Sequence, residues 1–423
     1  MMLKSRFGWK SSAIGITAAA LVIASFTAAH DDNEAAAASK QAKNVILFVG
    51  DGMGTAQRDA IRLATVGENG QLAMDDMPYL GLIHTSSTTP VTDSAAAATA
   101  FASGVKTYNG AVGMDANKKS VKTIMEYAKE MGKSTGLVTT SQITDATPAA
   151  FASHVEDRGK QSDIALQYLT KSKVDVLLGG GEDFWYPAGQ PGGFKDGQPD
   201  DPSEKSKGTQ GNLVDKAKSL GYAYVKNTTD MKKAKNGGKL LGLFANEEMF
   251  QQRPEGEGDI YNPVVSLPDM TKKAIESLSA NKKGFFLMVE EEATDEMAHQ
   301  NNAKLTIKAG QQLDQSVRIA KNFAASHPDT LVLVLADHET GGFSIEEVDA
   351  NDESGDAISK EDGPFAIAKS KMNFVVDWTT SGHTAVDVPV TVTGTGAELF
   401  SGVYENTGIF TRLAQAMGVK LPK

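Results

Sequence analysis

Continuous apolar runs separated by amphipathic stretches are the feature that most constrains the fold of this chain. Three runs, at 44–49 (NVILFV), 285–289 (FFLMV) and 330–335 (TLVLVL), show no alternation of polar and apolar residues. This pattern is typical of strands that are covered on both faces of a parallel sheet. Strands that alternate with helices predict an α/β fold, a three-layer α/β/α sandwich with a mainly parallel central sheet.

Hydrophobic periodicity predicts further elements along the chain. Other strands are expected at 80–86, 134–140, 174–178, 223–225, 240–244 and 388–392. Helices are expected at 54–66, 121–131, 162–170, 213–220, 269–279, 303–325 and 409–417. Two surface insertions are expected, one at 182–211, where Gly, Pro, Asp and Lys dominate, and one near 340–382, which contains an acidic stretch.

The N-terminus has the order of features found in secretory signal peptides. Basic residues precede an apolar stretch at 13–26, and small residues follow it. We therefore expect a signal peptide over 1–29, a flexible mature N-terminus over 30–43, one folded domain over 44–423, and a periplasmic or secreted location. The alternative is an uncleaved membrane anchor, although the apolar stretch is short for a membrane span.

Charge and cysteine content narrow the classes of partner. The formal net charge is −11, which argues against nucleic acid as a partner. After signal cleavage no stable membrane insertion is expected. The chain has no Cys, so a metal site must use His and carboxylate ligands. Such ligands favour zinc, magnesium and similar ions over metals bound by thiolates.

The segment 90–110 (PVTDSAAAATAFASGVKTYNG) predicts a loop followed by an Ala-rich helix of about ten residues. Ser94 would lie at the start of that helix, where free backbone N–H groups and the helix dipole favour negative charge. The alternative is that Asp93 or Ser94 is an ordinary N-cap residue. The segment alone does not distinguish the two interpretations.

Polar residues follow three of the expected buried strands. Asp51 follows the first, Glu290 ends another, and the adjacent pair Asp337 and His338 follows a third. In open α/β sheets, ligands bind at the carboxyl ends of the strands. Asp51 alone is weak evidence, because Asp-Gly is a common turn. The Asp-His pair is harder to attribute to packing.

Other segments carry possible ligands. Asp295 and His299 are four residues apart, a suitable spacing for a metal on one helix face, or simply part of an acidic first turn. His383 lies in a loop of small residues. Asp145 and Thr147 supply oxygen atoms suited to a hard cation before a Pro-initiated helix. The guanidinium of Arg158 suits phosphate, or is an ordinary surface charge.

Together these segments closely resemble the alkaline phosphatase family. The resemblance covers nearly the whole chain from about Asn44, and the combination of motifs in this order is highly specific. The motifs are DGMG at Asp51, TDSAAAATAFASGVKTYNG around Ser94, TDATPAAF at Asp145, HVEDR at Arg158, VEEEATDEMAH from Glu290, ADHETGG at Asp337 and SGHTA at His383.

The resemblance implies a site for two zinc ions and one magnesium ion. The first zinc would be held by Asp295, His299 and His383. The second, facing the nucleophile Ser94, would be held by Asp51, Asp337 and His338. The third ion would be held by Asp51, Glu290 and Thr147, with Asp145 binding one of its waters. Arg158 matches the residue that clamps phosphate, and Asp93 matches a residue that orients this arginine.

The implied activity is hydrolysis of phosphate monoesters to an alcohol and inorganic phosphate through a phosphoserine. Phosphoryl transfer depends mainly on positioned charge, which two metal ions supply to the attacking and leaving oxygens. The domain over 44–423 would then be the catalytic domain. Relatives are often homodimers, so a homodimer is also expected.

Three acidic residues near Asp295 depart from many relatives. Glu296 stands where the family varies, and with Glu291 and Glu292 it is expected to make the rim of the site more acidic. This leaves the identity of the third metal open.

Two rival functions are considered. Phosphodiesterases and sulfatases share the metal site, but the sequence after Ser94 lacks the sulfatase motif, and diesterases commonly use Thr and lack the arginine. A non-catalytic metal- or phosphate-binding protein would not need the serine.

Overall fold

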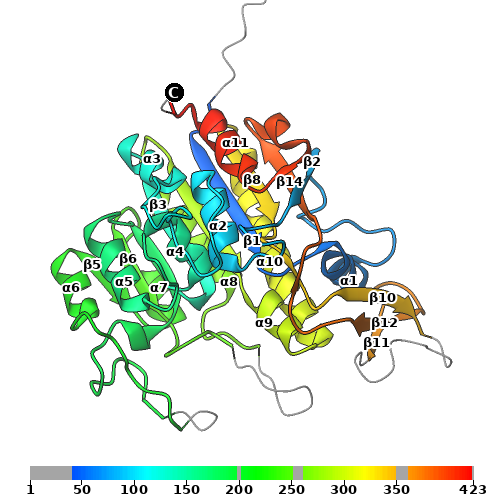
Figure 1. Cartoon of the computed structure of the whole chain (residues 1–423), viewed down its shortest axis with the longest axis horizontal. Coiled ribbons are helices and arrows are strands. Elements are labelled where there is room, and N and C mark those ends of the chain that lie inside the picture. The colour runs from blue at the N-terminus through cyan, green and yellow to red at the C-terminus, as the bar shows by residue number, and fades with distance from the viewer. Residues whose placement is uncertain (1–40, 198–201, 251–260, 349–360, 422–423) are drawn as a thin grey trace, which may run out of the picture. The chain divides into compact units, whose positions relative to one another are not determined.

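The computed structural model describes residues 41–197, 202–250, 261–348 and 361–421, which build a central ten-stranded sheet (Figure 1). The order of the strands is β15-β2-β14-β8-β1-β7-β3-β4-β6-β5. The strands are β1 (Asn44–Gly50), β2 (Tyr79–His84), β3 (Ser134–Gln142), β4 (Val176–Gly180), β5 (Tyr222–Val225), β6 (Lys239–Leu243), β7 (Phe285–Glu291), β8 (Thr330–Leu335), β14 (Val388–Gly394) and β15 (Gly402–Glu405).

The seven strands from β8 to β5 are parallel to one another. Strand β14 is antiparallel to both of its neighbours, β8 and β2. Every residue of β1, β7 and β8 is buried, as their continuous apolar sequences predict. The mainly parallel sheet expected from the sequence is therefore confirmed.

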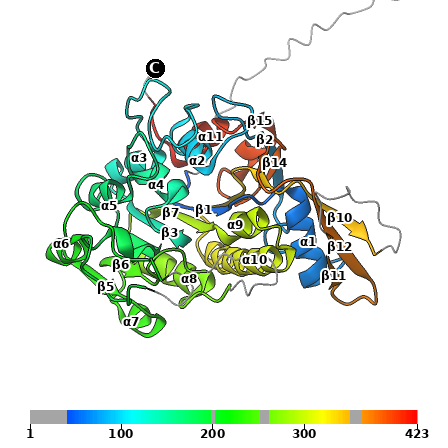
Figure 2. The same cartoon turned by 60° about the horizontal axis from the view of Figure 1, so that its bottom comes forward.

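Helices cover both faces of the sheet, so the three-layer α/β/α architecture is also confirmed (Figure 2). On one face α8 and α10 pack against the central strands, and α1 packs on α10. On the other face α3 and α4 contact β3 and β7, and α2 lies between α4 and α11. The helices are α1 (Thr55–Val66), α2 (Ser94–Ser103), α3 (Ile124–Glu130), α4 (Ala146–Ala152), α5 (Gln161–Thr170), α6 (Leu213–Ser219), α7 (Thr228–Lys233), α8 (Leu267–Leu278), α9 (Ala293–His299), α10 (Ala303–Ser326) and α11 (Gly408–Met417).

The segment 340–382 contains more structure than the sequence indicated. Strands β10 (Phe343–Glu347), β12 (Asn373–Trp378) and β11 (Asp362–Ala366) form a separate antiparallel sheet beside α1 (Figure 2). A small core supports it, in which Phe343 meets Trp378 edge to face at 4.8 Å. Most of the acidic stretch in this insertion, at 346–362, lies outside the described residues.

Other short elements were not predicted either. They are β15, α7 and the two-residue strands β9 (Glu339–Thr340) and β13 (His383–Thr384), which pair with each other. Elements of this length have too few residues to show a period.

The segment 182–211 begins with a 3₁₀ turn, Glu182–Phe184, and is otherwise irregular where it is described. Its Trp185 is fully buried and belongs to the main core, so the start of this segment is anchored to the sheet.

Two predictions about the N-terminus fall on residues that are not described. The signal peptide over 1–29 lies wholly outside the described residues, as does most of the 30–43 segment. In the described ranges, no helix combines the length and apolarity needed to cross a membrane.

Candidate active site

The expected polar residues meet where four adjacent central strands end. In the sheet order β8-β1-β7-β3, Asp337 and His338 follow β8, Asp51 follows β1, and Glu290 lies near the end of β7. Because these strands are parallel, their carboxyl ends lie on the same edge of the sheet. Residues more than 280 positions apart in the sequence are thereby brought together.

Ser94 is the first residue of α2 and is 3% exposed. Its Oγ lies 3.3 Å from Nε2 of His338. Asp93 is the N-cap residue, and its Oδ1 accepts a hydrogen bond of 2.9 Å from the backbone N–H of Ala96. The capping interpretation therefore holds for Asp93, and it leaves the hydroxyl of Ser94 directed into the site at a helix N-terminus.

One group of possible ligands is formed by Asp295, His299 and His383. Nε2 of His299 lies 3.2 Å from Oδ2 of Asp295 and 3.1 Å from Nε2 of His383. Both rings direct Nδ1 toward a backbone carbonyl, at 2.6 Å to Ser381 for His299 and 2.9 Å to Thr92 for His383. A carbonyl oxygen only accepts, so Nδ1 carries the hydrogen and each Nε2 is available as a ligand atom.

The second group is formed by Asp51, Asp337 and His338, all three essentially inaccessible to solvent. Nε2 of His338 lies 3.5 Å from Oδ1 of Asp51 and 3.2 Å from Oδ2 of Asp337. The other oxygen of Asp337 accepts a hydrogen bond of 3.1 Å from the N–H of Gly52, which fixes the carboxylate. Oδ1 of Asp51 and Oδ2 of Asp337, which face His338, have no hydrogen-bond partner among the described residues.

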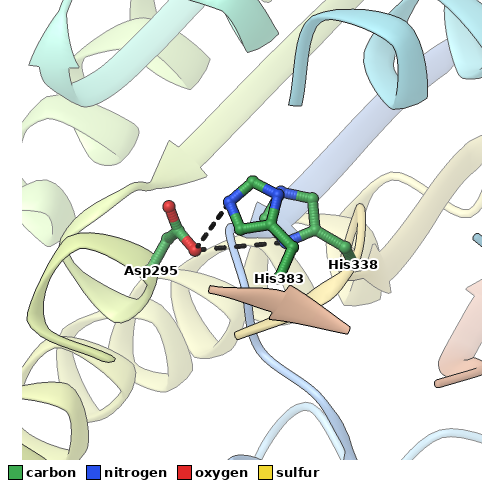
Figure 3. Close-up of side chains that lie close together, drawn as sticks. All are labelled: Asp295, His338 and His383. Atoms are coloured by element: carbon green, nitrogen blue, oxygen red, sulfur yellow. Dashed lines mark ion pairs between the residues drawn. The ribbon is translucent and has the colours of Figure 1, made fainter. Parts of the chain in front are cut away.

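His338 lies between these two groups. Its ring stacks on that of His383 with centroids 3.6 Å apart, and Asp295 lies beside both rings (Figure 3). Nδ1 of His338 lies 4.0 Å from Asp295 but only 3.2 Å from the hydroxyl of Thr340. Because Thr340 contacts Nδ1, Nε2 of His338, on the side of Asp51 and Asp337, is the ring nitrogen that is available to a ligand.

Asp51 also borders a third group, with Thr147 and Glu290. The hydroxyl of Thr147 lies 3.5 Å from Oδ2 of Asp51. Oε2 of Glu290 accepts a hydrogen bond of 2.5 Å from Thr139, while its Oε1 is buried and has no hydrogen-bond partner in the described part of the chain. The first turn of α4 contains Thr147, with Asp145 as its N-cap, so Thr147 lies inside this helix rather than before it as expected.

Arg158 is held by two of the predicted carboxylates. Its Nη2 lies 3.0 and 3.1 Å from the two oxygens of Asp145, and its Nη1 lies 3.6 Å from Oδ2 of Asp93. That oxygen of Asp93 also accepts a hydrogen bond of 2.8 Å from the N–H of Gly110. The Arg158 side chain is one-third exposed, so it has both fixed partners and access to a ligand.

The donors in these groups fit divalent cations. They are carboxylate oxygens, imidazole nitrogens and hydroxyls, which zinc and magnesium bind. Burial and the neighbouring charge of Asp337 raise the pKa of Asp51 well above its usual range. Burial likewise raises the pKa of Glu290 to about 8. Buried carboxylates without hydrogen-bond partners are costly unless a cation compensates them, so the residues fit metal ions.

The acidic residues next to Asp295 do not all lie at the rim, which corrects the expectation for Glu291 and Glu292. Its carboxylate is fully buried and accepts hydrogen bonds from Thr140 at 2.7 Å and Tyr261 at 2.6 Å. Glu291 is therefore a satisfied core residue on the far side of β7. Glu292 is buried as well, and burial together with the charge of Glu296 raises its pKa well above the usual range. Glu296 is half-buried, and burial together with the charge of Asp295 raises its pKa.

Some neighbours of the site were missed by sequence analysis. Thr139 and Thr340 donate hydrogen bonds to Glu290 and Asp295, and Glu248 adds a further carboxylate near Asp145 and Glu296. Burial raises the pKa of Glu248 to about 7. Threonines in strands and a Glu in a polar loop carry no local signal of such roles, because only the tertiary structure brings them to the site.

Stability of the metal-free protein is expected to fall as pH rises from 6.5 to 8. Burial raises the pKa of Glu290 to about 8. For His299, burial lowers the pKa, but the hydrogen bond to Asp295 outweighs this effect and the pKa rises to about 9. In this interval the folded protein holds protons that the unfolded chain has lost, so rising pH favours unfolding. The low pKa of His338, about 3, acts in the opposite direction only below about pH 6.5.

Thermal unfolding at pH 6.5 and 8, with chelator and with zinc plus magnesium, measures this effect. Bound cations should remove most of the pH dependence, because they compensate the carboxylates and displace the histidine protons. Equal pH dependence with and without metal would contradict the prediction.

Known proteins share both the sequence and the fold. Residues 42–368 match the family model for alkaline phosphatases. Alkaline phosphatase 4 of Bacillus subtilis (strain 168) is 34% identical, over 94% of this chain and 95% of that protein. Alkaline phosphatase of Escherichia coli (strain K12) is 33% identical, over 90% of this chain and 87% of that protein. The solved alkaline phosphatase from the Antarctic bacterium TAB5 is 31% identical over 90% of this chain and all of that chain, with a TM-score of 0.71.

The family-model match includes Ser94 and the clustered carboxylates and histidines except His383, which lies beyond residue 368. The buried groups at one edge of the α/β sheet fit metal ions, in agreement with these similarities. The sequence matches show that this chain belongs to the alkaline phosphatase family, whose members are metal-dependent hydrolases of phosphate monoesters.

Proposed function

We propose that this phosphatase forms a phosphoserine on Ser94 and hydrolyses it at a site for two zinc ions and one magnesium ion. The observation that carries the proposal is the place of the Ser94 hydroxyl. It lies at the N-terminus of α2 and 3.3 Å from His338, which belongs to the second ligand group. The preceding residue, Asp93, forms an ion pair with the guanidinium of Arg158. A phosphate there would meet backbone N–H groups, an arginine and the metal ligands.

The ligand sets are those that the family resemblance implies, and the clustering of Asp51 with Asp337 and His338, and of Asp295 with His383, supports them. We assign the first zinc to Asp295, His299 and His383. We assign the second zinc to Asp51, Asp337 and His338. We assign the magnesium to Asp51, Glu290 and Thr147, with Asp145 in its outer shell. When bound, these ions supply Lewis acid chemistry that stabilises negative charge on the attacking and leaving oxygens.

The side chains of the protein have separate roles in the reaction. Arg158 binds two phosphate oxygens and orients the group for attack, while Asp93 and Asp145 hold the guanidinium in place. Oγ of Ser94 attacks phosphorus in line with the leaving oxygen, the P–O bond to the alcohol breaks, and a phosphoserine remains. Water then attacks phosphorus from the side that the alcohol left, and the P–O bond to Ser94 breaks.

Two successive in-line displacements predict net retention of configuration at phosphorus. A monoester made chiral with oxygen isotopes and sulfur, turned over with an alcohol as acceptor, gives a product whose configuration can be read by phosphorus NMR. Retention is expected. Inversion would mean direct attack by the acceptor and would contradict the phosphoserine.

The rival diesterase function is tested by one comparison. Nitrophenyl phosphate and bis-nitrophenyl phosphate share a leaving group, so their kcat/KM values report only the difference at phosphorus. The monoester is expected to be preferred, because Arg158 is placed to bind two unesterified oxygens. A preference for the diester would contradict this assignment.

We also propose that residues 1–29 are a signal peptide and that the enzyme works in the periplasm or outside the cell. The basic, apolar and small-residue order of this segment supports the proposal. N-terminal sequencing of the protein recovered outside the cytoplasm tests it, with a mature terminus near residue 30 as the expected result.

A further inference from the structure

Three carboxylates that the proposed mechanism does not use surround Asp145, the residue that holds Arg158. Glu248 follows β6, Glu292 is the N-cap of α9, and Glu296 lies one turn further along that helix. Glu248 and Glu296 are half-buried, whereas Glu292 is only 4% exposed. We call Glu248, Glu292 and Glu296 the acidic wall. It offers two partly accessible carboxylates beside a buried one.

Hydrogen bonds at the end of β3 hold the three segments of the acidic wall together. The N–H of Glu292 donates to Oγ1 of Thr140 at 3.1 Å. Two residues further on, Nε2 of Gln142 donates to Oε1 of Glu248 at 2.8 Å. The carbonyl of Gln142 accepts a hydrogen bond of 2.8 Å from the N–H of Asp145. The segments that follow β3, β6 and β7 therefore meet at one place.

The buried member of the acidic wall points to a ligand. Oε2 of Glu292 is inaccessible to solvent and has no hydrogen-bond partner in the described ranges. Burial, and then the charges of Glu296, Asp145 and Glu248, raise its pKa well above the usual range. A buried carboxylate with carboxylate neighbours is costly unless a proton or a cation compensates it. A proton shared with Glu296 and a cation beside the wall are the two possibilities.

The acidic wall lies on the side from which the alcohol would leave. An in-line displacement places the leaving oxygen opposite Oγ of Ser94. That side carries the first ligand group, Asp295, His299 and His383. Glu296 directly follows Asp295 in α9 and is close enough to His299 for their charges to interact. An alcohol attached to the leaving oxygen would therefore come within reach of Glu296.

The charge of the acidic wall determines which alcohols it would favour. Carboxylates near the phosphate repel an anionic alcohol and gain nothing from a neutral one, but they attract a positive group. This inference rests on the proposed function. We propose that Glu296 and Glu248 bind the positive end of a phosphate monoester whose alcohol carries an ammonium group, and that the buried charge of Glu292 strengthens this attraction.

The test compares two esters that differ in charge but not in shape. They are the phosphate ester of choline and its carbon analogue, in which a carbon atom replaces the quaternary nitrogen. Both kcat/KM values are measured with zinc and magnesium present, above pH 8, where Glu248, whose pKa is about 7, is ionised. We expect the choline ester to be favoured at least about tenfold, and added salt to reduce this preference by screening the charges.

Variants of the acidic wall assign the preference to its residues. E296Q keeps the size of the side chain and should lower the ratio of the two kcat/KM values by about tenfold. E248Q, on a different segment, should lower the ratio by about threefold. E276Q removes an exposed carboxylate from α8 and is the matched control for the net charge, so its ratio should equal that of the original protein.

The ratio cancels any effect of a substitution on the metals or on Ser94, because both esters depend on them equally. An unchanged ratio in both E296Q and E248Q would overturn the proposal, and would mean that a shared proton or an inorganic cation already compensates the acidic wall. So would a ratio that falls equally in E276Q. If the original protein hydrolysed neither ester, the proposed function would fail together with this inference, whereas hydrolysis of both esters with equal kcat/KM would contradict this inference alone.

Discussion

Replacing Ser94 by alanine is expected to lower kcat for a phosphate monoester by at least about a thousandfold, with zinc content unchanged. The substitution removes the atom that is proposed to become phosphorylated. It leaves Asp93 as the N-cap of α2 and leaves every proposed metal ligand in place. Steady-state kinetics, metal analysis and thermal unfolding of the purified variant provide the measurement.

Ser103 supplies a matched control at the other end of the same helix. It is also buried, and its hydroxyl donates to the carbonyl of Thr99 at 2.7 Å, outside the site. S103A should keep its activity and lose only a little stability. Activity of S94A close to that of S103A would reject Ser94 as the nucleophile.

The fold could be predicted largely because its central strands are buried on both faces. The runs at 44–49, 285–289 and 330–335 became β1, β7 and β8, which are adjacent in the sheet. The sequence of a single strand does not determine its position in the sheet, because that position depends on where the connecting helices pack. The sheet formed by β10, β12 and β11 could not be predicted, because it is stabilised by contact with α1 and by Trp378.

The clustering of the candidate ligands was predictable where they follow strand ends or share a helix. Asp295 and His299 lie one helical turn apart in α9, as their spacing indicates. His383 is different. Its loop has no period, and the residue reaches His338 only because β13 pairs with β9, which places His383 opposite Thr340. Only the resemblance to a family indicated its role.

The burial of acidic residues could not be predicted from composition. Glu290, Glu291 and Glu292 are consecutive, yet the alternation of a strand directs Glu290 toward the metal ligands and Glu291 toward Tyr261. Likewise the insertion at 182–211 reads as a polar surface loop, although Asp183 and Glu204 are buried. Tertiary contacts decide which carboxylates become ligands.

The second large effect is expected for Asp51→Asn. Asp51 lies between two ligand groups, with Oδ1 facing His338 and Oδ2 facing Thr147. The amide keeps the size of the side chain but removes the negative charge, so it should weaken binding at both the second zinc and the magnesium position. Activity should fall at least about a hundredfold, because removing only a supporting residue of a metal site already costs up to that amount.

Metal analysis distinguishes loss of a metal ligand from general destabilisation of the core. Glu291→Gln is the matched control. Both carboxylates are buried at the ends of adjacent strands, β1 and β7, but Glu291 is satisfied by Thr140 and Tyr261 rather than facing the ligands. E291Q should therefore lose stability while retaining its metals and most of its activity. D51N should lose metal from two positions, while the zinc that we propose is held by Asp295, His299 and His383 should remain. If D51N kept all of its metals, Asp51 would not be the shared ligand. If E291Q lost its metals as D51N does, the loss would follow from removing any buried charge rather than from the position of Asp51 between the two ligand groups.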